Sequence, residues 1–369
     1  MDKKSGFKSA SFYYMSGTGN SFRTAVWAAE ELKAADKTNV TPLEKAFFKK
    51  PSERGSEPPL YENKKINQNT LTGIFYPTHG FTAPWAVFKF ALSMPRSNGA
   101  PVILVATRAG AFYPFPLPGM EGTSCLLIAL ILALKGYDVR GFTGMDMPSN
   151  WLVVHWGMNK KHAEYFYDKT KKELAAFIPG INSGKRIYKS MPSWIMGVLL
   201  LQVSFMYLIF ARLMLAKIMF ADETCNNCGI CAKYCPFDAI TMLGGKHKKP
   251  YWTFKCESCE RCIAYCPKKS IQAGHSYLLA LYWVFYGVLG FIPLYVADKF
   301  IILQSGLPAT ALSILYSLAF FFIGYLALNL LSRTKLFAWL FSHTTFTKIY
   351  RRYNQHDTTL NDLKNGTEV

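Results

Sequence analysis

Two copies of one cysteine spacing constrain this chain more than any other feature. Eight of its nine cysteines follow the pattern C-x2-C-x2-C-x3-C-P, and the second copy begins 31 residues after the first. Three thiolates this close together can bind one [4Fe–4S] cubane, while the fourth, next to the proline, reaches across to a second cubane. The spacing therefore predicts two clusters. Their ligands are Cys225, Cys228, Cys231 and Cys266 for the first, and Cys256, Cys259, Cys262 and Cys235 for the second.

Two other uses of cysteine compete with this interpretation, a disulfide framework and a pair of zinc sites. Disulfides need an oxidising compartment, and the first eight residues contain no apolar run of the kind found in a cleaved signal peptide. Zinc sites favour four ligands in two short pairs over a three-plus-one arrangement. Two clusters are therefore the better prediction. The ninth cysteine, Cys125, lies in an apolar run, and we expect it to be a buried helix residue.

The repeat extends beyond the cysteines, because residues 234–240 match residues 265–271. With this match, residues 217–276 resemble the bacterial-type ferredoxin domain. The resemblance implies a small α+β domain made of two related halves that exchange their fourth cluster ligands.

A glycine- and hydroxyl-rich loop near the N-terminus indicates a phosphate site. Residues 11–15 predict a short strand, residues 16–21 form the loop, and a helical pattern follows. A strand, a loop and a helix N-terminus in this order present backbone N–H groups, hydroxyls and the helix dipole to a phosphate. The loop matches neither Walker A nor G-x-G-x-x-G. The alternative is an ordinary turn between a strand and a helix.

This loop resembles the phosphate loop of flavodoxins, which has the pattern Ser/Thr-x-Thr-Gly-x-Ser/Thr. The resemblance implies that the cofactor is FMN. The residues expected to hold it are Ser16, Gly17, Thr18, Gly19, Asn20 and Ser21.

Buried strands predicted at residues 72–76, 101–106 and 139–145 imply a doubly wound parallel sheet, closed by a charged helix at 157–178. Ligands of such sheets lie beyond the C-terminal ends of the strands. We expect two loops there to wall the flavin, through Pro77, Thr78, His79, Gly80, Thr107, Arg108, Ala109 and Gly110. Asn150 is a further candidate, and Arg108 would stabilise reduced FMN. The aromatic stacking candidates are Phe81, Trp85, Phe112 and Tyr113.

Composition and long uncharged stretches predict a membrane protein. The net charge is +19, from 42 basic and 23 acidic residues, and half of the residues are apolar. Residues 190–211, 277–297 and 300–332 carry no charge, and stretches of this length can cross a bilayer. The positive-inside rule favours a hairpin of the second and third stretches, which keeps every strongly basic region in the cytoplasm. The first stretch is then a membrane-embedded or buried helix. Three spans are the alternative.

Residues 8–180 and 217–276 together resemble the fused flavodoxin–ferredoxin proteins of the EFR-type ferredoxin family. The predicted membrane helices depart from that resemblance, because a soluble fusion lacks them. The fold class that we predict is an α/β flavodoxin-like doubly wound parallel sheet, a small α+β two-cluster ferredoxin domain and transmembrane helices. The predicted parts are a flavodoxin-like FMN-binding domain at 8–180, an apolar helix at 190–216, the ferredoxin domain at 217–276, a transmembrane hairpin at 277–332 and a basic cytoplasmic tail at 333–369.

The leading functional hypothesis is a membrane-anchored protein that passes electrons between FMN, two [4Fe–4S] clusters and a redox partner protein. Its place would be the cytoplasmic membrane, in contact with the lipid bilayer, with both redox domains facing the cytoplasm. One alternative is a flavin-dependent reductase of a small substrate such as a quinone. Another is an electron-transfer or docking subunit of a larger membrane complex. No motif predicts a set of catalytic residues or a nucleic-acid partner.

Overall fold

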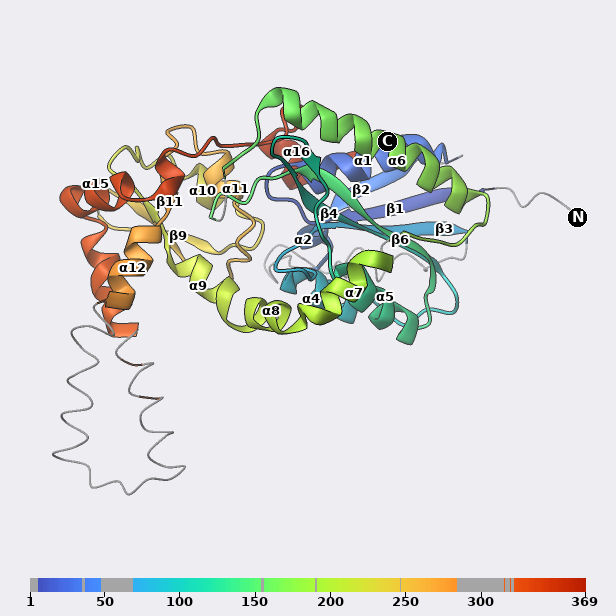
Figure 1. Cartoon of the computed structure of the whole chain (residues 1–369), viewed down its shortest axis with the longest axis horizontal. Coiled ribbons are helices and arrows are strands. Elements are labelled where there is room, and N and C mark those ends of the chain that lie inside the picture. The colour runs from blue at the N-terminus through green and yellow to red at the C-terminus, as the bar shows by residue number, and fades with distance from the viewer. Residues whose placement is uncertain are drawn as a thin grey trace, which may run out of the picture.

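The computed structural model describes residues 6–34, 37–47, 69–153, 156–189, 191–245, 247–283, 315, 319 and 322–369. A large domain built on a parallel sheet occupies one end of the molecule, and a small domain with the paired cysteine motifs occupies the other (Figure 1). The C-terminal strand returns to the large domain, so both ends of the chain contribute strands to one sheet.

The sheet has the strand order of flavodoxins. Its strands run in the order β12-β2-β1-β3-β4-β6-β7, and the pairs from β2 to β7 are parallel. Counted along the chain, the five central strands stand in the order 2-1-3-4-5, with the topological switch point between β1 and β3. This confirms the predicted doubly wound parallel sheet. The strands are β1 Ser9–Tyr14, β2 Thr38–Pro42, β3 Thr70–Pro77, β4 Pro101–Phe112, β6 Asp138–Pro148, β7 Ile187–Tyr188 and β12 Thr367–Glu368, with β5 Pro116–Leu117 paired to β4.

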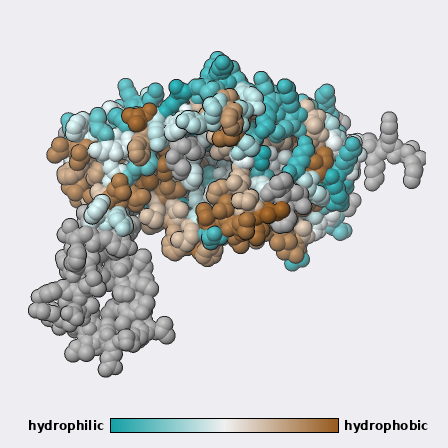
Figure 2. All heavy atoms as spheres, in the orientation of Figure 1, coloured by the Kyte–Doolittle hydropathy of each residue, from teal (hydrophilic) through white to brown (hydrophobic). Residues whose placement is uncertain are grey.

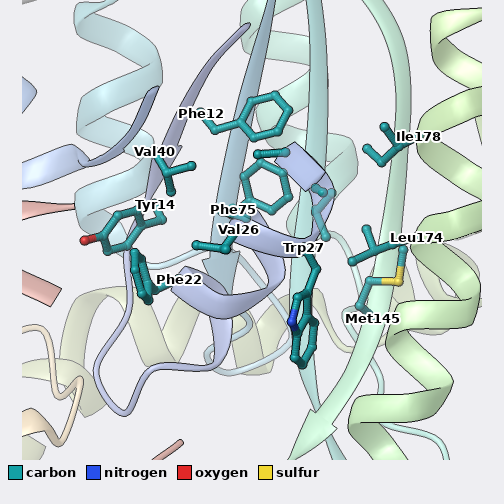
Figure 3. Packing of buried hydrophobic residues seen from close by; sticks show 14 of the residues in the cluster. Phe12, Tyr14, Phe22, Val26, Trp27, Val40, Phe75, Met145, Leu174 and Ile178 are labelled. Carbon is teal, nitrogen blue, oxygen red and sulfur yellow. The ribbon is translucent and has the colours of Figure 1, made fainter. Parts of the chain in front are cut away.

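Helices cover both faces of the sheet, as strands that are apolar on both sides require. On one face lie α1 (Asn20–Leu32) and α6 (Lys160–Asn182), and on the other α4 (Trp85–Ser93) and α5 (Ser124–Leu134), with the short α2 (Leu43–Phe47) beside α4. Figure 3 shows the first core, where Phe12 and Phe75 of the sheet meet Trp27 of α1 and Leu174 of α6. Cys125 on α5 is 1% exposed, which confirms it as a buried helix residue.

The small domain repeats one backbone conformation in its two halves. Strands β8 (Met219–Ala221) and β11 (Ile271–Ala273) pair, as do β9 (Ile240–Leu243) and β10 (Lys249–Trp252), and each cysteine motif carries one short helix, α10 (Ile230–Lys233) or α11 (Arg261–Ala264). Positive φ angles recur at the same offset of 31 residues as the cysteines, which supports the predicted internal repeat. These pairs are Asn227 and Ser258, Gly229 and Glu260, and Asp238 and Lys269.

Three corrections concern the ends of predicted elements. Strand β4 continues six residues beyond the predicted end, because β6 pairs with it as far as Gly110 and Pro148. The predicted loop Thr107–Gly110 is therefore part of a strand. The closing helix runs to Asn182 rather than 178. Residues 333–369, predicted as a basic tail, are folded: α15 (Lys335–His343), the 3-10 helix Phe346–Lys348 and α16 (Leu360–Asn365) precede β12.

The first uncharged stretch lies along the large domain as a broken helix. Its parts are α7 (Met191–Leu199), α8 (Leu201–Met206), a π-helical turn at Tyr207–Ala211 and α9 (Arg212–Lys217). In the part of the chain that the structure describes, no helix combines the length and the apolarity needed to cross a bilayer. The predicted hairpin falls largely outside the described residues. Its described ends, α12 (His275–Trp283) and helical residues 322–331, are joined by a hydrogen bond from Tyr277 Oη to the Tyr325 carbonyl at 3.1 Å.

Candidate cofactor sites

The predicted phosphate loop leads directly into α1. Gly19 has a φ of 105°, a left-handed value that glycine adopts without steric cost, and α1 begins at Asn20. The Gly19 N–H donates to Ser16 Oγ at 3.2 Å, and the hydroxyls of Ser21 and Thr107 lie 2.8 Å apart. These contacts fix a loop of N–H and hydroxyl groups at the positive end of the α1 dipole, where an anion is stabilised.

A pocket opens at this loop. It brings together residues from the phosphate loop, from the ends of β3, β4 and β6, and from the second cysteine motif. Eleven of the fourteen residues predicted for the flavin line it: Ser16, Gly17, Thr18, Asn20, Ser21, Pro77, Thr78, His79, Thr107, Arg108 and Ala109.

The lining of this pocket fits a polar cofactor. Three of its buried polar atoms have no hydrogen-bond partner among the described residues, namely Thr78 Oγ1, Trp151 Nε1 and Ser258 Oγ. Buried polar groups are normally paired, so these atoms indicate a ligand with several hydrogen-bonding groups. The residues present therefore fit FMN, whose phosphate would be held by residues 16–21 and whose ring system would lie toward Thr78 and Trp151.

Three of the predicted flavin residues, all of them glycines, do not line the pocket. A Cβ added to Gly19 would lie 2.8 Å from Gln355 Cβ, and one on Gly80 would lie 2.6 Å from Tyr207. One on Gly110 would lie 2.4 Å from the Phe166 ring. These three glycines leave room for neighbouring protein atoms, and none of them lines the pocket.

Arg108 is held by carboxylates, although it lines the pocket. Its guanidinium forms ion pairs of 2.6 Å with both Glu121 and Asp146, whose side chains are fully buried. Lys169 also pairs with Asp146, so two cations and two carboxylates compensate one another in this group. The predicted role of Arg108 as the counter-charge for reduced FMN therefore lacks a free cation.

The aromatic residues at the pocket differ from the predicted ones. Tyr113 is 77% exposed, and Phe112 stacks on His162 with ring centroids 3.9 Å apart. Because β4 extends through Phe112, both rings lie beyond the pocket. The predicted candidates Phe81 and Trp85 also do not line it, and the aromatic residues that do are His79 and Trp151.

Sequence reasoning missed Tyr207, which lies in the π-helical turn and supports His79. Its hydroxyl is 2.9 Å from His79 Nδ1, and its ring is 3% exposed. Burial lowers the pKa of His79 to about 4, so the imidazole is neutral near pH 7. Only the presence of a tyrosine in an otherwise apolar stretch could have drawn attention to it.

The structure brings the cysteines of the two motifs together. A second pocket is lined by Cys225, Cys228, Cys231 and Cys266, which are predicted for the first cluster, and by Cys262, which is predicted for the second. Burial is the largest cause of the raised pKa of the Cys262 thiol, and the thiols of Cys256, Cys259 and Cys235 raise this pKa further. The fourth cysteine of each motif therefore lies with the other motif, as crossed ligation of two cubanes requires.

Among the described residues, no group of three His, Cys, Asp or Glu side chains is arranged to hold a single metal ion. Four thiolates, as in each predicted set, are the donors that a [4Fe–4S] cluster takes.

The second cysteine motif packs directly on the phosphate loop. A Cβ added to Gly17 would lie 1.7 Å from the Cys259 carbonyl oxygen. Arg261, which is 3% exposed, donates from Nη2 to the Ser16 carbonyl at 2.7 Å. The Glu260 carboxyl accepts hydrogen bonds from the Leu152 N–H at 2.7 Å and the Val153 N–H at 3.1 Å. The site predicted for the second cluster and the pocket predicted for FMN therefore share a wall.

The C-terminal residues complete this site. Gln355 donates its N–H to the Thr18 carbonyl at 2.8 Å, and Tyr353 Oη donates to Asn20 Oδ1 at 2.7 Å. On the other side, Arg352 donates to the Ile263 and Ile271 carbonyls, both at 2.8 Å. Residues 352–355 thus connect the phosphate loop with the small domain.

Comparison with known proteins finds a family model and solved chains that match. The model described as "4Fe-4S dicluster domain" matches residues 224–271. A solved chain titled "Structure of a flavodoxin from the domain Archaea" is 13% identical, and the match covers 47% of this chain and 98% of that one with a TM-score of 0.28. At that score the fold assignment rests on the strand order described above. No curated protein matches the chain. An iron–sulfur domain joined to a flavodoxin-like fold indicates electron transfer.

Proposed function

We propose that this chain is a membrane-anchored electron-transfer protein that binds FMN and two [4Fe–4S] clusters and passes electrons between them and a redox partner protein. The observation that carries the proposal is the contact of Gly17 in the phosphate loop with Cys259 in the second cysteine motif. When bound, FMN exchanges one or two electrons and each cluster exchanges one, so their combination couples two-electron to one-electron chemistry.

The protein fixes the positions of the two redox sites and excludes water from the phosphate loop. Four phosphate-loop residues are at most 6% exposed, because the second cysteine motif and residues 352–358 cover the loop; they are Ser16, Thr18, Asn20 and Ser21. The Arg261 and Glu260 contacts hold the two domains in one arrangement, since both side chains are at most 3% exposed. Electron transfer within one chain requires a fixed distance between the two redox sites, with water excluded from the space between them.

The first cysteine motif is the contact point that we propose for the redox partner. Cys228 is the exposed cysteine of the eight in the two motifs. Tyr234 and Leu360 line the pocket of this motif, and the ammonium groups of Lys233 and Lys364 lie 5.3 and 5.7 Å from the Tyr234 ring centroid. Both lysines are exposed. Positive charge around an open redox site favours a partner with an acidic surface.

Anchoring belongs to the proposal through the sequence of residues 277–332, which contains only Asp298 and Lys299 as charged residues. By the positive-inside rule, the basic small domain and the basic C-terminal residues favour the cytoplasmic side for both redox domains. Membership of the EFR-type family is part of the same proposal.

A rate measurement tests whether electrons from the partner enter at the first cluster before they reach the flavin. Full-length protein loaded with both cofactors is mixed anaerobically with a reduced acidic ferredoxin, and flavin bleaching is followed by stopped-flow absorbance. We expect Cys228→Ser, which lacks a ligand of the first cluster, to slow flavin reduction at least about tenfold, because the partner loses its contact cluster. An unchanged rate would show that electrons reach the flavin by another route.

Two alternatives stay predictions from the sequence. A flavin-dependent reductase of a small substrate such as a quinone would need a substrate position beside the flavin. A docking subunit would need a larger complex. Turnover with a soluble quinone in place of the ferredoxin would support the first alternative. Co-purification of partner subunits from membranes would support the second.

A further inference from the structure

The helix run Met191–Lys217 exposes its large apolar side chains. Residues 191–211 carry no charge. On a helix that faces water, the large apolar side chains form the buried stripe and polar ones face outward. Here the large apolar side chains are 38–63% exposed, and they are Ile195, Met196, Val198, Leu199, Leu201, Val203, Phe205, Met206, Ile209, Phe210 and Met214.

The side of the run that faces the protein carries small and hydroxyl residues together with a few large ones. Ser193 Oγ accepts the Gly122 N–H at 3.0 Å, and a Cβ on Gly197 would lie 2.5 Å from the Gly122 carbonyl carbon. Ser204 Oγ donates to the Gly80 carbonyl at 2.9 Å, Tyr207 is buried, and Leu208 packs against the sheet domain. Small and hydroxyl residues on the inner side are typical of helices that pack closely in lipid. The run therefore exposes more large apolar side chains than a water-exposed amphipathic helix does.

The exposed face lies on the same side of the molecule as α12 and the helical residues 322–331. Figure 1 shows α7, α8 and α9 along one side of the sheet, with α12 and the helical residues 322–331 at the same side of the small domain. Leu279 and Trp283 of α12 are 59% and 68% exposed, and Leu326 and Leu330 are 45% and 69% exposed. In Figure 2 hydrophobic residues extend along this side, from beneath the sheet domain to the small domain. The apolar surface of the run thus continues into the residues that lead to the proposed anchor.

We infer that the apolar face of residues 195–214 rests in the surface of a lipid bilayer, parallel to the membrane. This inference rests on the anchoring part of the proposed function and adds a second contact to it. The exposed Lys189 precedes the run, and a basic side chain at the end of an apolar segment can reach anionic headgroups. At the other end Arg212 pairs with Glu257 and Lys217 donates to the Trp252 carbonyl, so both of these cations are engaged within the protein. A bilayer matches the uncharged face better than a protein interface with its polar rim does.

The inference assigns the run a second role at the flavin pocket. Its inner face carries Ser204 and Tyr207, which bond to Gly80 and His79 in the loop after β3. Contact with lipid would therefore hold the helix that supports this wall of the pocket. The membrane surface and the flavin site lie on opposite faces of one helix.

Site-specific crosslinking tests the inference in the full chain. Phe205→p-benzoylphenylalanine places a photoreactive group on the exposed face, where Phe205 is 60% exposed. The protein is inserted into vesicles of phosphatidylcholine and phosphatidylglycerol and irradiated, and lipid adducts are measured by mass spectrometry. Tyr165→p-benzoylphenylalanine is the matched control, because Tyr165 is a 44% exposed aromatic residue on α6, across the sheet from the run. We expect roughly tenfold more lipid adduct at position 205 than at 165.

Trp283→p-benzoylphenylalanine, at the start of the predicted hairpin, distinguishes failure of the inferred lipid contact from failure of the proposed membrane anchor. Adducts at 283 without adducts at 205 would overturn the inference and leave the anchor in place. Absence of lipid adducts at both positions would contradict the anchor itself. Protein–protein adducts at 205 in place of lipid would assign the face to a second copy or to a partner subunit, and would also overturn the inference.

Discussion

The two cysteine motifs have the same ligand spacing and different surroundings. Aligned by their offset of 31 residues, the four residues between the first three cysteines differ in each case. In the first motif they are Asn226, Asn227, Gly229 and Ile230, and in the second they are Glu257, Ser258, Glu260 and Arg261. The backbone is alike, because Asn227 and Ser258, and Gly229 and Glu260, share positive φ angles. The difference therefore lies in the side chains.

In the second motif, each of these side chains faces the large domain or its helix run. Glu257 lies 3.8 Å from Lys89 Nζ and 3.6 Å from an Arg212 nitrogen. Ser258 lines the flavin pocket, Glu260 accepts two backbone N–H groups after β6, and Arg261 donates to the phosphate loop. Cysteine spacing therefore determines the cluster type. The residues between the cysteines determine which part of the protein each cluster faces.

Loss of one ligand from each motif tests this comparison with the largest expected effect. Cys259→Ser and Cys228→Ser should each lower the iron content from about eight toward about four atoms per chain. Only Cys259→Ser should also loosen the contact between the domains, because Cys259 lies against Gly17. Limited proteolysis measures this loosening. Equal proteolytic sensitivity of the two variants would show that the motifs are equivalent.

Exchange of residues between the motifs should give the next largest effect. The double variant Glu260→Gly and Arg261→Ile gives the second motif the residues of the first. It leaves Glu44, the ion-pair partner of Arg261 at 3.5 Å, uncompensated. Removing one partner of a buried ion pair costs about 3–5 kcal/mol, and we expect a loss of that order in the free energy of unfolding, measured by denaturant titration.

The reciprocal variant, Gly229→Glu with Ile230→Arg, is the control for this exchange. It places both charges in the motif that carries the exposed Cys228, where water solvates them, so the charges should cost less than about 1 kcal/mol. The left-handed φ of 71° at Gly229 adds about 1 kcal/mol for a residue with a Cβ, so the total should stay below that of the first exchange. A larger loss in this variant than in the first one would reverse the comparison.

Glycine substitutions give a smaller effect. Gly17→Ala forces a Cβ to within 1.7 Å of the Cys259 carbonyl oxygen, and overpacking of this kind costs about 1–3 kcal/mol. Gly229→Ala meets no atom within 4 Å but has a φ of 71°, so it should cost about 1 kcal/mol. Gly245→Ala meets no atom within 4 Å either and is the unstrained control. Thermal unfolding of the three variants should rank them in this order, and a Gly17 variant as stable as the Gly245 variant would remove the proposed close contact.

Acid should affect the flavin end through His79. Its folded-state pKa of about 4 lies below the ordinary value of 6.5, so the unfolded chain binds a proton first as the pH falls. The stabilisation is present above pH 6.5 and is lost between pH 6.5 and 4. At pH 5 the loss is roughly 2 kcal/mol. Denaturant titrations of the cofactor-free chain at pH 7.5 and 5 should show a smaller pH dependence in His79→Gln, and an identical pH dependence would contradict the burial of a neutral imidazole.

The sequence predicts best the features that are formed by residues close together in the chain. Cysteine spacing determines which thiols can reach one cubane, and a short strand–loop–helix segment forms the phosphate loop. The length of β4 could not be predicted, because it depends on pairing with β6, which lies elsewhere in the chain. The same limit applies to Tyr207 and to residues 352–355, whose contacts with the pocket come from packing between segments far apart in sequence.

The affinity for FMN tests most directly the claim that the flavin pocket and the second cluster share a wall. FMN fluorescence is titrated anaerobically with the wild-type chain, with Cys259→Ser and with Cys228→Ser, after reconstitution with iron and sulfide. The account predicts one FMN per wild-type chain, an affinity at least about tenfold weaker in Cys259→Ser and a change of less than about twofold in Cys228→Ser. Absence of FMN binding to the wild-type chain, or equal weakening in the two variants, would contradict it.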